Sequence, residues 1–261
     1  MDDPATLLAE ADARDMSGWD FGWLGSRMTS SGLPWDYPAI VGDWVSRSTS
    51  VLDMGTGGGE FLAGVHGLPP RTVATEGWAP NVRVAAQRLG AVHISVVHDE
   101  GATDNLEQRD RDARGRLSFR DESFDLVHSR HEAYNPGEVR RVLRSDGAFL
   151  TQQAGSGGTD AGALLGVPRP HESFDRAFAV EQLREAGFDV VDGDSAVEAM
   201  TFADIGAFAW YLNVIPWIVP GFTIEGYRPR LLELHDRGTP LVIRATRFWL
   251  LARKGAMKGT S

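Results

Sequence analysis

The stretch Val51-Leu52-Asp53-Met54-Gly55-Thr56-Gly57-Gly58-Gly59-Glu60-Phe61 determines how the rest of the sequence is interpreted. Apolar residues are followed by an acidic residue, Asp53, by glycines at every second position, and then by a sequence able to start a helix. This order predicts a buried strand, a tight turn and a helix, because glycine allows positive φ and close approach of the backbone to a ligand. In an open parallel sheet such a turn lies at the carboxyl end of its strand, where ligands bind.

The spacing of these glycines separates two classes of cofactor. A nicotinamide or flavin fingerprint has the pattern G-x-G-x-x-G, so counting from Gly55 its third glycine would be residue 60. That position holds Glu60, whose carboxylate would repel a diphosphate. Because Asp53 precedes the first glycine by two residues, the turn suits a ligand that carries an ammonium and a sulfonium.

Strand-like and helix-like stretches alternate on both sides of the turn. The expected strands are Ser50–Met54, Thr72–Thr75, Val92–Val97, Phe124–His128, Ala148–Gln152, Phe188–Val191 and Thr246–Ala252. The expected helices are Pro4–Ala13, Ala39–Ser46, Glu60–His66, Ala79–Leu89, Gly137–Leu143, Val180–Ala186 and Thr201–Val214. This alternation predicts an α/β fold with a doubly wound, mostly parallel seven-stranded sheet that has helices on both faces.

Composition along the chain predicts its domain organisation. Residues 1–48, rich in tryptophan and turn formers, are expected to form an N-terminal helical and aromatic cap segment. Residues 49–253 are expected to form the cofactor domain, with 198–240 inserted as a small helical cap, and 254–261 a flexible tail. Residues 155–175 are rich in glycine and predict a long loop, the usual place for an active-site lid.

Overall composition argues against several functions. The chain has no cysteine, which excludes disulfides, thiolate metal sites and a cysteine nucleophile. Asp and Glu total 36 against 26 Lys and Arg, a formal net charge of −10 that disfavours binding to a nucleic-acid backbone. No apolar run approaches the ~20 residues of a membrane span, and no spacing of side chains predicts a metal site. We expect a cytoplasmic monomer or homodimer whose partner is a small-molecule substrate, without nucleic-acid or membrane partners.

Four segments together resemble the class I S-adenosylmethionine-dependent methyltransferases. Residues 53–59 have the pattern of the family's first motif, and Glu76 occupies the place of the acidic residue that accepts both ribose hydroxyls. Residues 123–131 resemble the fourth segment, and 139–150 the helix–turn–strand that follows it, with Ser145-Asp146-Gly147 where the family usually has Pro-Gly-Gly. The resemblance covers most of the chain and implies a Rossmann-like fold with S-adenosylmethionine as cofactor.

The resemblance also implies which residues bind the cofactor. They are Asp53, Gly55, Thr56, Gly57, Gly59, Phe61, Glu76, Gly77, Trp78, Asp99, Glu100, Ser129 and Arg130. Asp99 is the choice for the adenine amino group, with Glu100 and Asp104 as competitors, and a solvated acidic loop is the alternative interpretation of this segment.

In the same family the ends of the fourth and fifth strands face the transferable methyl group. His131 follows the fourth strand and is predicted as the catalytic general base, because histidine titrates near neutral pH. The alternative is that His131 lines the cofactor site or fixes the loop. Glu132, the second predicted catalytic residue, could orient the histidine or bind a cationic acceptor. The aromatic residues expected to bind substrate are Trp19, Trp23, Trp35, Tyr134, Trp210, Tyr211 and Trp217, and each could instead fill a core.

We therefore expect a methyltransferase that modifies an oxygen or nitrogen atom of a small molecule, such as a secondary metabolite. An RNA methyltransferase is the first alternative, although the negative charge opposes it. A second is an enzyme that uses the same cofactor without methyl transfer, such as an intramolecular cyclase. The alternative outside enzymes is a binding or scaffold protein that retains the cofactor fold.

Overall fold

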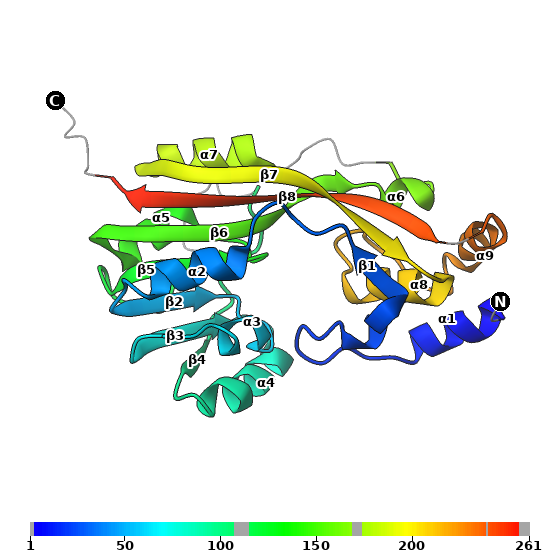
Figure 1. Cartoon of the computed structure of the whole chain (residues 1–261), viewed down its shortest axis with the longest axis horizontal. Helices are drawn as coiled ribbons and strands as arrows, with labels where there is room; N and C mark the ends of the chain where they lie inside the picture. The colour runs from blue at the N-terminus through cyan, green and yellow to red at the C-terminus, as the bar shows by residue number, and fades with distance from the viewer. Residues whose placement is uncertain (1–2, 107–114, 169–173, 239, 256–261) are drawn as a thin grey trace.

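One sheet of eight strands runs along the molecule (Figure 1). The structure is a computed structural model and describes residues 3–106, 115–168, 174–238 and 240–255. The strands are β1 (Met28–Ser30), β2 (Ser50–Met54), β3 (Arg71–Glu76), β4 (Ser95–His98), β5 (Phe124–Arg130), β6 (Leu143–Thr159), β7 (Phe188–Phe202) and β8 (Leu241–Lys254). Their spatial order is β1-β7-β8-β6-β5-β2-β3-β4.

The half of the sheet that holds the glycine turn is parallel. β2 pairs in parallel with β3 and β5, β3 with β4, and β5 with β6. β8 lies antiparallel between β6 and β7. The predicted α/β class with a mostly parallel, doubly wound sheet is confirmed. The sequence did not predict the eighth strand, β1, a three-residue segment that pairs antiparallel with the end of β7.

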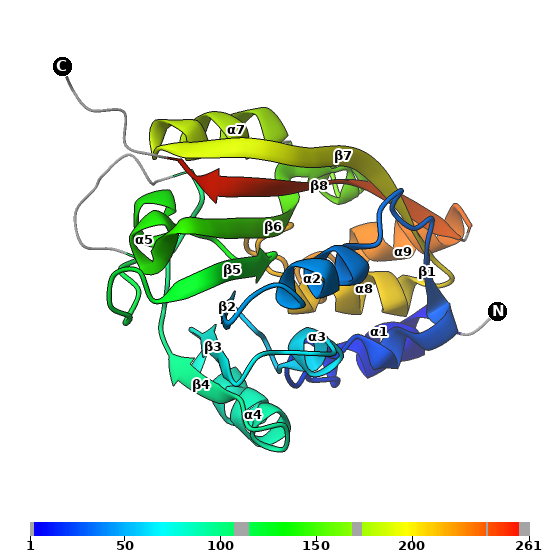
Figure 2. The same cartoon turned by 60° about the vertical axis from the view of Figure 1, so that its left-hand side comes forward.

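Helices cover both faces of this sheet (Figure 2). α2 (Tyr37–Val45) packs on the face formed by alternate residues such as Val51 and Leu126. α5 (Pro136–Val142) and α7 (Arg176–Glu185) pack on the opposite face, over Leu52 and Val127. Successive strand residues point to opposite faces, so neighbouring apolar residues serve two separate cores. α3 (Glu60–Ala63) and α4 (Ala79–Gly90) bury Leu62 and Leu89 together beside β3.

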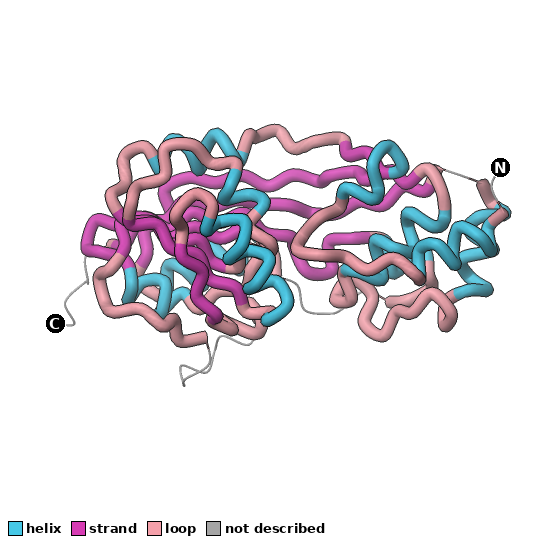
Figure 3. The backbone as a smooth tube through the Cα atoms, turned by 90° about the horizontal axis from the view of Figure 1, so that it is seen from below, coloured by secondary structure: helices cyan, strands magenta, loops and turns pink. Residues whose placement is uncertain are grey.

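A second, helical part lies at one end of the long strands (Figure 3). It contains α1 (Pro4–Asp12), the 3₁₀ helix η1 (Gly22–Arg27), α6 (Ala161–Leu164), α8 (Ile205–Val214) and α9 (Arg228–Asp236). We call this part the helical cap. Its core is separate from those under the sheet helices and includes nearly all of α8. Arg27 pairs with Asp204, the N-cap of α8, at 2.6 Å and ties η1 to it.

Several expected boundaries were wrong. The predicted loop 155–175 begins as strand, because β6 continues to Thr159 along β8, and α6 follows; residues 169–173 lie outside the described residues. The strand predicted at 188–191 runs on to Phe202. The helix predicted at 201–214 begins only at Ile205, where the side chain of Asp204 accepts the N–H of Ala207. α9 was not predicted.

The first 48 residues contribute to both parts of the molecule. α1 and η1 pack in the helical cap, whereas α2 packs on the sheet. At the other end, β8 includes Lys254, and residues 256–261 lie outside the described residues. No helix in the described ranges is long and apolar enough to span a bilayer.

Candidate functional site

The glycine loop, residues 55–59, connects β2 to α3. Gly55, Gly57 and Gly59 have φ values of 65°, 63° and 80°, a region that side-chain-bearing residues rarely adopt. The loop is held against β3 because the N–H of Thr56 donates to the carbonyl of Thr75 at 2.8 Å. A Cβ placed on Gly55 would lie 2.5 Å from Oε2 of Glu132, so this loop leaves room for a neighbouring side chain only because it is glycine.

Three carboxylates converge on this loop, and we call them the carboxylate cradle: Asp53, Glu76 and Glu132. Glu76 accepts hydrogen bonds from the backbone N–H groups of Gly57 at 2.7 Å and Trp78 at 2.9 Å. Burial raises the pKa of Asp53 and of Glu76. Burial, together with the charges of Glu76 and Asp53, raises the pKa of Glu132 to about 8. A cationic ligand would relieve the repulsion between these groups.

Asp53 of the cradle forms a buried pair with His128. Nε2 of His128, on β5, lies 3.3 Å from Oδ1 of Asp53, on the adjacent strand β2. Burial raises the pKa of the carboxyl and lowers the pKa of the imidazole, because both charged forms lose their hydration. The ring of Phe61 packs edge-on against the imidazole, with 5.7 Å between the ring centres. His128 therefore packs against Asp53 from the adjacent strand, without a hydrogen bond between them.

The loop after β4 adjoins the end of β3. The N–H of Asp99 donates to the carbonyl of Glu76 at 3.1 Å, and the carboxylate of Asp99 accepts the N–H groups of Gly101 and Ser118. A Cβ on Gly77 would come within 3.1 Å of the Cα of Glu100. Trp78 is 55% exposed next to this contact. Asp99 is thus part of an ordered turn beside Glu76, and its role toward adenine stays a prediction.

His131 directly follows β5 and has a φ of 64°. Its N–H donates to the carbonyl of Gln152 at 2.8 Å, and its Nε2 lies 3.4 Å from Nε2 of the same glutamine. Burial, followed by the charges of Arg247 and Arg130, lowers its pKa to about 3. The imidazole is therefore neutral at pH 7 and only weakly basic, and the predicted role of general base stays a prediction.

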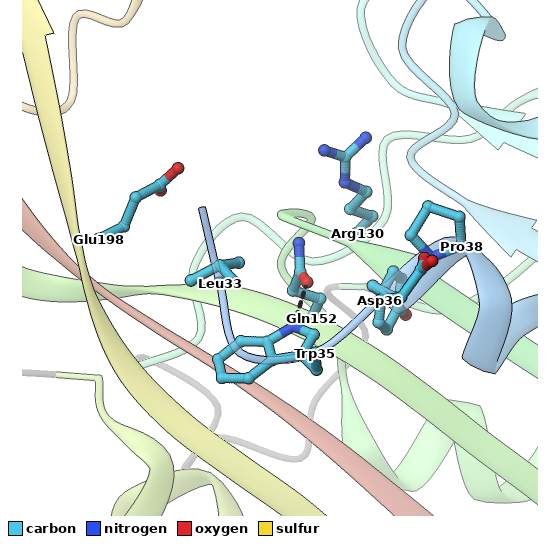
Figure 4. A pocket seen from close by; sticks show the side chains of 8 residues that line it. Leu33, Trp35, Asp36, Pro38, Arg130, Gln152 and Glu198 are labelled. Carbon is cyan, nitrogen blue, oxygen red and sulfur yellow. Dashed lines mark hydrogen bonds between the residues drawn. The ribbon is translucent and has the colours of Figure 1, made fainter. Parts of the chain in front are cut away.

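A cavity of about 310 Å³ opens where the end of β5 pairs with the middle of β6 (Figure 4). We call it the β5–β6 cavity. Its lining residues are Leu33, Trp35, Asp36, Tyr37, Pro38, Arg130, Gln152 and Glu198. Nε1 of Trp35 donates to Oε1 of Gln152 at 2.8 Å. The sequence prediction missed Gln152 and Glu198. Gln152 ends the fifth expected strand and could have been found by that position, whereas Glu198 lies on the unpredicted extension of β7.

The two predicted cofactor residues at the end of β5, Ser129 and Arg130, differ in their exposure. Ser129 is buried, and its carbonyl accepts the hydroxyl of Tyr37 at 3.1 Å. Arg130 is exposed, with its guanidinium carbon 5.1 Å from the centre of the Phe61 ring. Arg130 thus links the glycine-loop helix to the β5–β6 cavity.

The predicted substrate-binding aromatic residues do not form one wall. Trp19 lies over the glycine loop, with its Cβ 3.2 Å from a Cβ placed on Gly57, and Trp217 stacks on Trp19 with 5.8 Å between ring centres. Trp35 lines the β5–β6 cavity. The others lie in cores: Trp23, Trp210 and Tyr211 in the helical cap, and the buried Tyr134 against Phe149.

The comparisons with known proteins agree with this geometry. Residues 52–151 match the family model described as a methyltransferase domain. A candidate methyltransferase from Bacillus halodurans is 18% identical, with 84% of this chain and 97% of that chain covered and a TM-score of 0.58. The YcgJ protein from Bacillus subtilis is 15% identical, with coverages of 84% and 98% and a TM-score of 0.55. A functionally unknown protein from Deinococcus radiodurans is 18% identical, with coverages of 87% and 90% and a TM-score of 0.52.

No curated protein sequence matches the chain. Within the described ranges no group of three or more histidine, aspartate and glutamate side chains is placed to hold a metal ion. The order of the strands, the glycine loop with its acidic neighbours and the matched domain all lead to one assignment. Residues 52–151 match a methyltransferase domain, and the chain as a whole has the Rossmann-like fold of the similar structures.

Proposed function

We propose that this protein transfers a methyl group from S-adenosylmethionine to an oxygen or nitrogen atom of a small molecule. The carboxylate cradle around the glycine loop carries the proposal, because Asp53, Glu76 and Glu132 bring three carboxyl groups, whose ionised forms a cation would stabilise, to a site within a methyltransferase domain. The proposed cofactor carries an ammonium and a sulfonium, so its charge complements the cradle.

The residues of the cradle also fit the rest of the cofactor. Glu76 is the last residue of β3, and its carboxylate accepts hydrogen bonds from two backbone N–H groups. It keeps further lone pairs that can accept hydrogen bonds from the two ribose hydroxyls. Gly55 and Gly57 allow the backbone to approach the ligand. When bound, S-adenosylmethionine supplies a methyl group that an acceptor lone pair takes from the sulfonium, leaving a neutral thioether, while a proton leaves the acceptor.

The β5–β6 cavity supports a small acceptor. Its volume of about 310 Å³ is at the lower end of the range for small-molecule sites, and it adjoins Phe61 of the cofactor helix through Arg130. Of the two predicted catalytic residues, Glu132 has a pKa of about 8, closer to neutral pH than that of His131. A general base works best with a pKa near the working pH, so we propose Glu132 as the better placed of the two.

Calorimetric titration tests the cofactor. We expect the protein to bind S-adenosylmethionine and S-adenosylhomocysteine but not NAD. Glu76→Ala should weaken both interactions by about 1.5–3 kcal/mol for each charge-assisted bond that is lost. The matched control is Glu185→Gln, on the exposed face of α7, which should leave both affinities unchanged. Binding of NAD alone would contradict the proposal.

Product analysis tests the acceptor. Cofactor labelled in the methyl group is incubated with the protein and either a small-molecule fraction or an RNA fraction of a cell extract. We expect label in the small-molecule fraction together with equal amounts of S-adenosylhomocysteine. Label in RNA would instead identify an RNA methyltransferase, and cofactor consumption without label transfer would identify a non-methylating enzyme.

A further inference from the structure

Arg130 presents a positive charge to the β5–β6 cavity. Its side chain is exposed at the end of β5, among the lining residues of the cavity (Figure 4). Its guanidinium carbon lies 5.1 Å from the centre of the Phe61 ring. Among the described residues, none forms a hydrogen bond or an ion pair with its guanidinium. Partial desolvation lowers its pKa, but an arginine stays charged at any physiological pH.

The two carboxylates that line the same cavity already have partners. Oε2 of Glu198 lies 3.1 Å from Nε of Arg247, and its Oε1 accepts the hydroxyl of Ser30 at 2.6 Å. Asp36 is the N-cap of α2 and accepts the N–H of Ala39 at 3.0 Å. Arg130 is therefore the charged lining group that a ligand can still neutralise.

The remaining lining groups are suited to a flat organic molecule. Trp35, Leu33 and Pro38 provide apolar surface, and the indole N–H of Trp35 is already used by Gln152. The amide nitrogen of Gln152 faces the neutral imidazole of His131 at 3.4 Å. A guanidinium matches a carboxylate with two parallel hydrogen bonds, which fixes a ligand in orientation as well as in charge.

We propose that the β5–β6 cavity binds a small organic acid and that Arg130 holds its carboxylate. If the proposed function is correct, this acid is the methyl acceptor. That identification rests on the proposed function, whereas the binding of an acid at Arg130 does not. The site then has two electrostatic halves, an acidic cradle for the cationic cofactor and a guanidinium for the anionic acceptor. The carboxylate of the cofactor itself is the competing ligand for Arg130, and the experiment separates the two.

The test uses three probes of similar size and different charge: phenylacetate, its planar isostere phenylacetamide, and phenylethylamine. Ligand-observed NMR gives their affinities for the full-length protein, with and without saturating S-adenosylhomocysteine. We expect the acid to bind the wild type at least about tenfold more tightly than the amide. Arg130→Gln should bring the ratio near one, and Arg130→Lys should retain part of it, since lysine keeps the charge but not the planar fork.

Arg47→Gln is the matched control, because Arg47 is also exposed and stacked on an aromatic ring, that of Trp44 at 5.3 Å. It should keep the wild-type ratio. Thermal melting confirms that each variant is folded. The inference is overturned if the acid binds no better than the amide, if the amine is preferred, or if the acid shows no binding to the wild type.

It is also overturned if Arg130→Gln weakens S-adenosylhomocysteine binding while the ratio of acid to amide stays unchanged, because Arg130 then serves the cofactor. Failure of S-adenosylhomocysteine to bind the wild type is a different result, since it contradicts the proposed function. The acid-to-amide ratio measured without that ligand still decides the present inference in that case.

Discussion

Among single residues, Glu132 has the environment most sensitive to the charge of a bound cofactor. Its side chain lies against Gly55, and no described residue donates a hydrogen bond to its carboxylate. S-adenosylmethionine has one more positive charge than S-adenosylhomocysteine. The cation of S-adenosylmethionine should lower the pKa of Glu132, and each unit of that lowering corresponds to about a tenfold gain in affinity. We therefore expect Glu132→Gln to reduce the ratio of the affinity for S-adenosylmethionine to that for S-adenosylhomocysteine by about tenfold for each such unit. Calorimetry with both ligands measures the ratio, and Glu185→Gln is the control; an unchanged ratio would show that Glu132 does not face the sulfonium.

The same residue predicts a dependence of binding on pH. Glu132 has a pKa of about 8 without ligand, so below pH 8 it is mostly protonated, and a cation must displace that proton. The charged groups that raise this pKa are Glu76 on β3 and Asp53 on β2. We expect the affinity for S-adenosylmethionine to rise as the pH approaches 8 and then level off, with proton release measured by calorimetry in two buffers of different ionisation enthalpy. The affinity for S-adenosylhomocysteine, whose sulfur is uncharged, should change less with pH.

Residue spacing predicted part of this site and missed another part for a physical reason. Asp53 and Glu76 each end a strand next to the glycine loop, so their position follows from local sequence. Glu132 was predicted as a catalytic residue from its place after the fourth expected strand, but its contact with Gly55 depends on the pairing of β5 with β2, about 70 residues away, which no local pattern records. Glu198 reaches the cavity through the long pairing of β7 with β8.

Among the elements, β7 and β8 depart most from the expectations based on sequence. Beyond residue 191, β7 contains Asp192, Gly193, Asp194 and Ser195, which are turn-forming residues in a local pattern. The strand persists because its backbone pairs with β8 through Phe202 and Leu241. Pairing between distant segments thus overrides local propensity. By contrast, β2 and β5, which are buried along most of their length, were predicted from local pattern.

The irregular point in this pair of strands predicts a strong effect of a small substitution. Gly193 has a φ of 149° just after the register shift between Val190 and Asp192. An added Cβ would lie 2.5 Å from the carbonyl oxygen of Trp249. We expect Gly193→Ala to lower the free energy of unfolding by about 1–3 kcal/mol, measured by urea denaturation.

The matched control for that substitution is Gly42→Ala in α2, where a Cβ would meet nothing within 4 Å. Alanine in place of a helical glycine should raise stability slightly, because the unfolded chain loses conformational freedom. If Gly193→Ala were as stable as the wild type, the bulge would have to tolerate a side chain by shifting its register.

For the whole molecule, buried ionisable groups of the site predict how stability depends on pH. Glu132 has its pKa raised from 4.5 to about 8, so its folded form keeps a proton that the unfolded chain releases, and stability falls as the pH rises from 6.5 to 8. His131 has its pKa lowered from 6.5 to about 3, so the unfolded chain binds the extra proton, and stability falls as the pH drops from 4.5 to 3. Between about 4.5 and 6.5 the two effects oppose each other.

Urea denaturation across this range of pH checks the expectation. Relative to the wild type, Glu132→Gln should reduce the loss of stability on the alkaline side, and His131→Gln should reduce the loss on the acid side. Glu185→Gln should follow the wild type throughout, because its side chain is exposed. The same profile for all four proteins would show that neither site residue titrates as the structure implies.

The crowding of Asp53, Glu76 and Glu132 has a consequence for turnover on the proposed function. Loss of the methyl group converts the sulfonium to an uncharged sulfur, so the attraction that drew the cofactor in disappears at the moment of reaction. Below pH 8, Glu132 can then take up a proton again, so the acids no longer hold the spent molecule by charge. On the proposed function, the groups that favour the charged reactant over the uncharged product therefore also favour exchange of product for fresh cofactor.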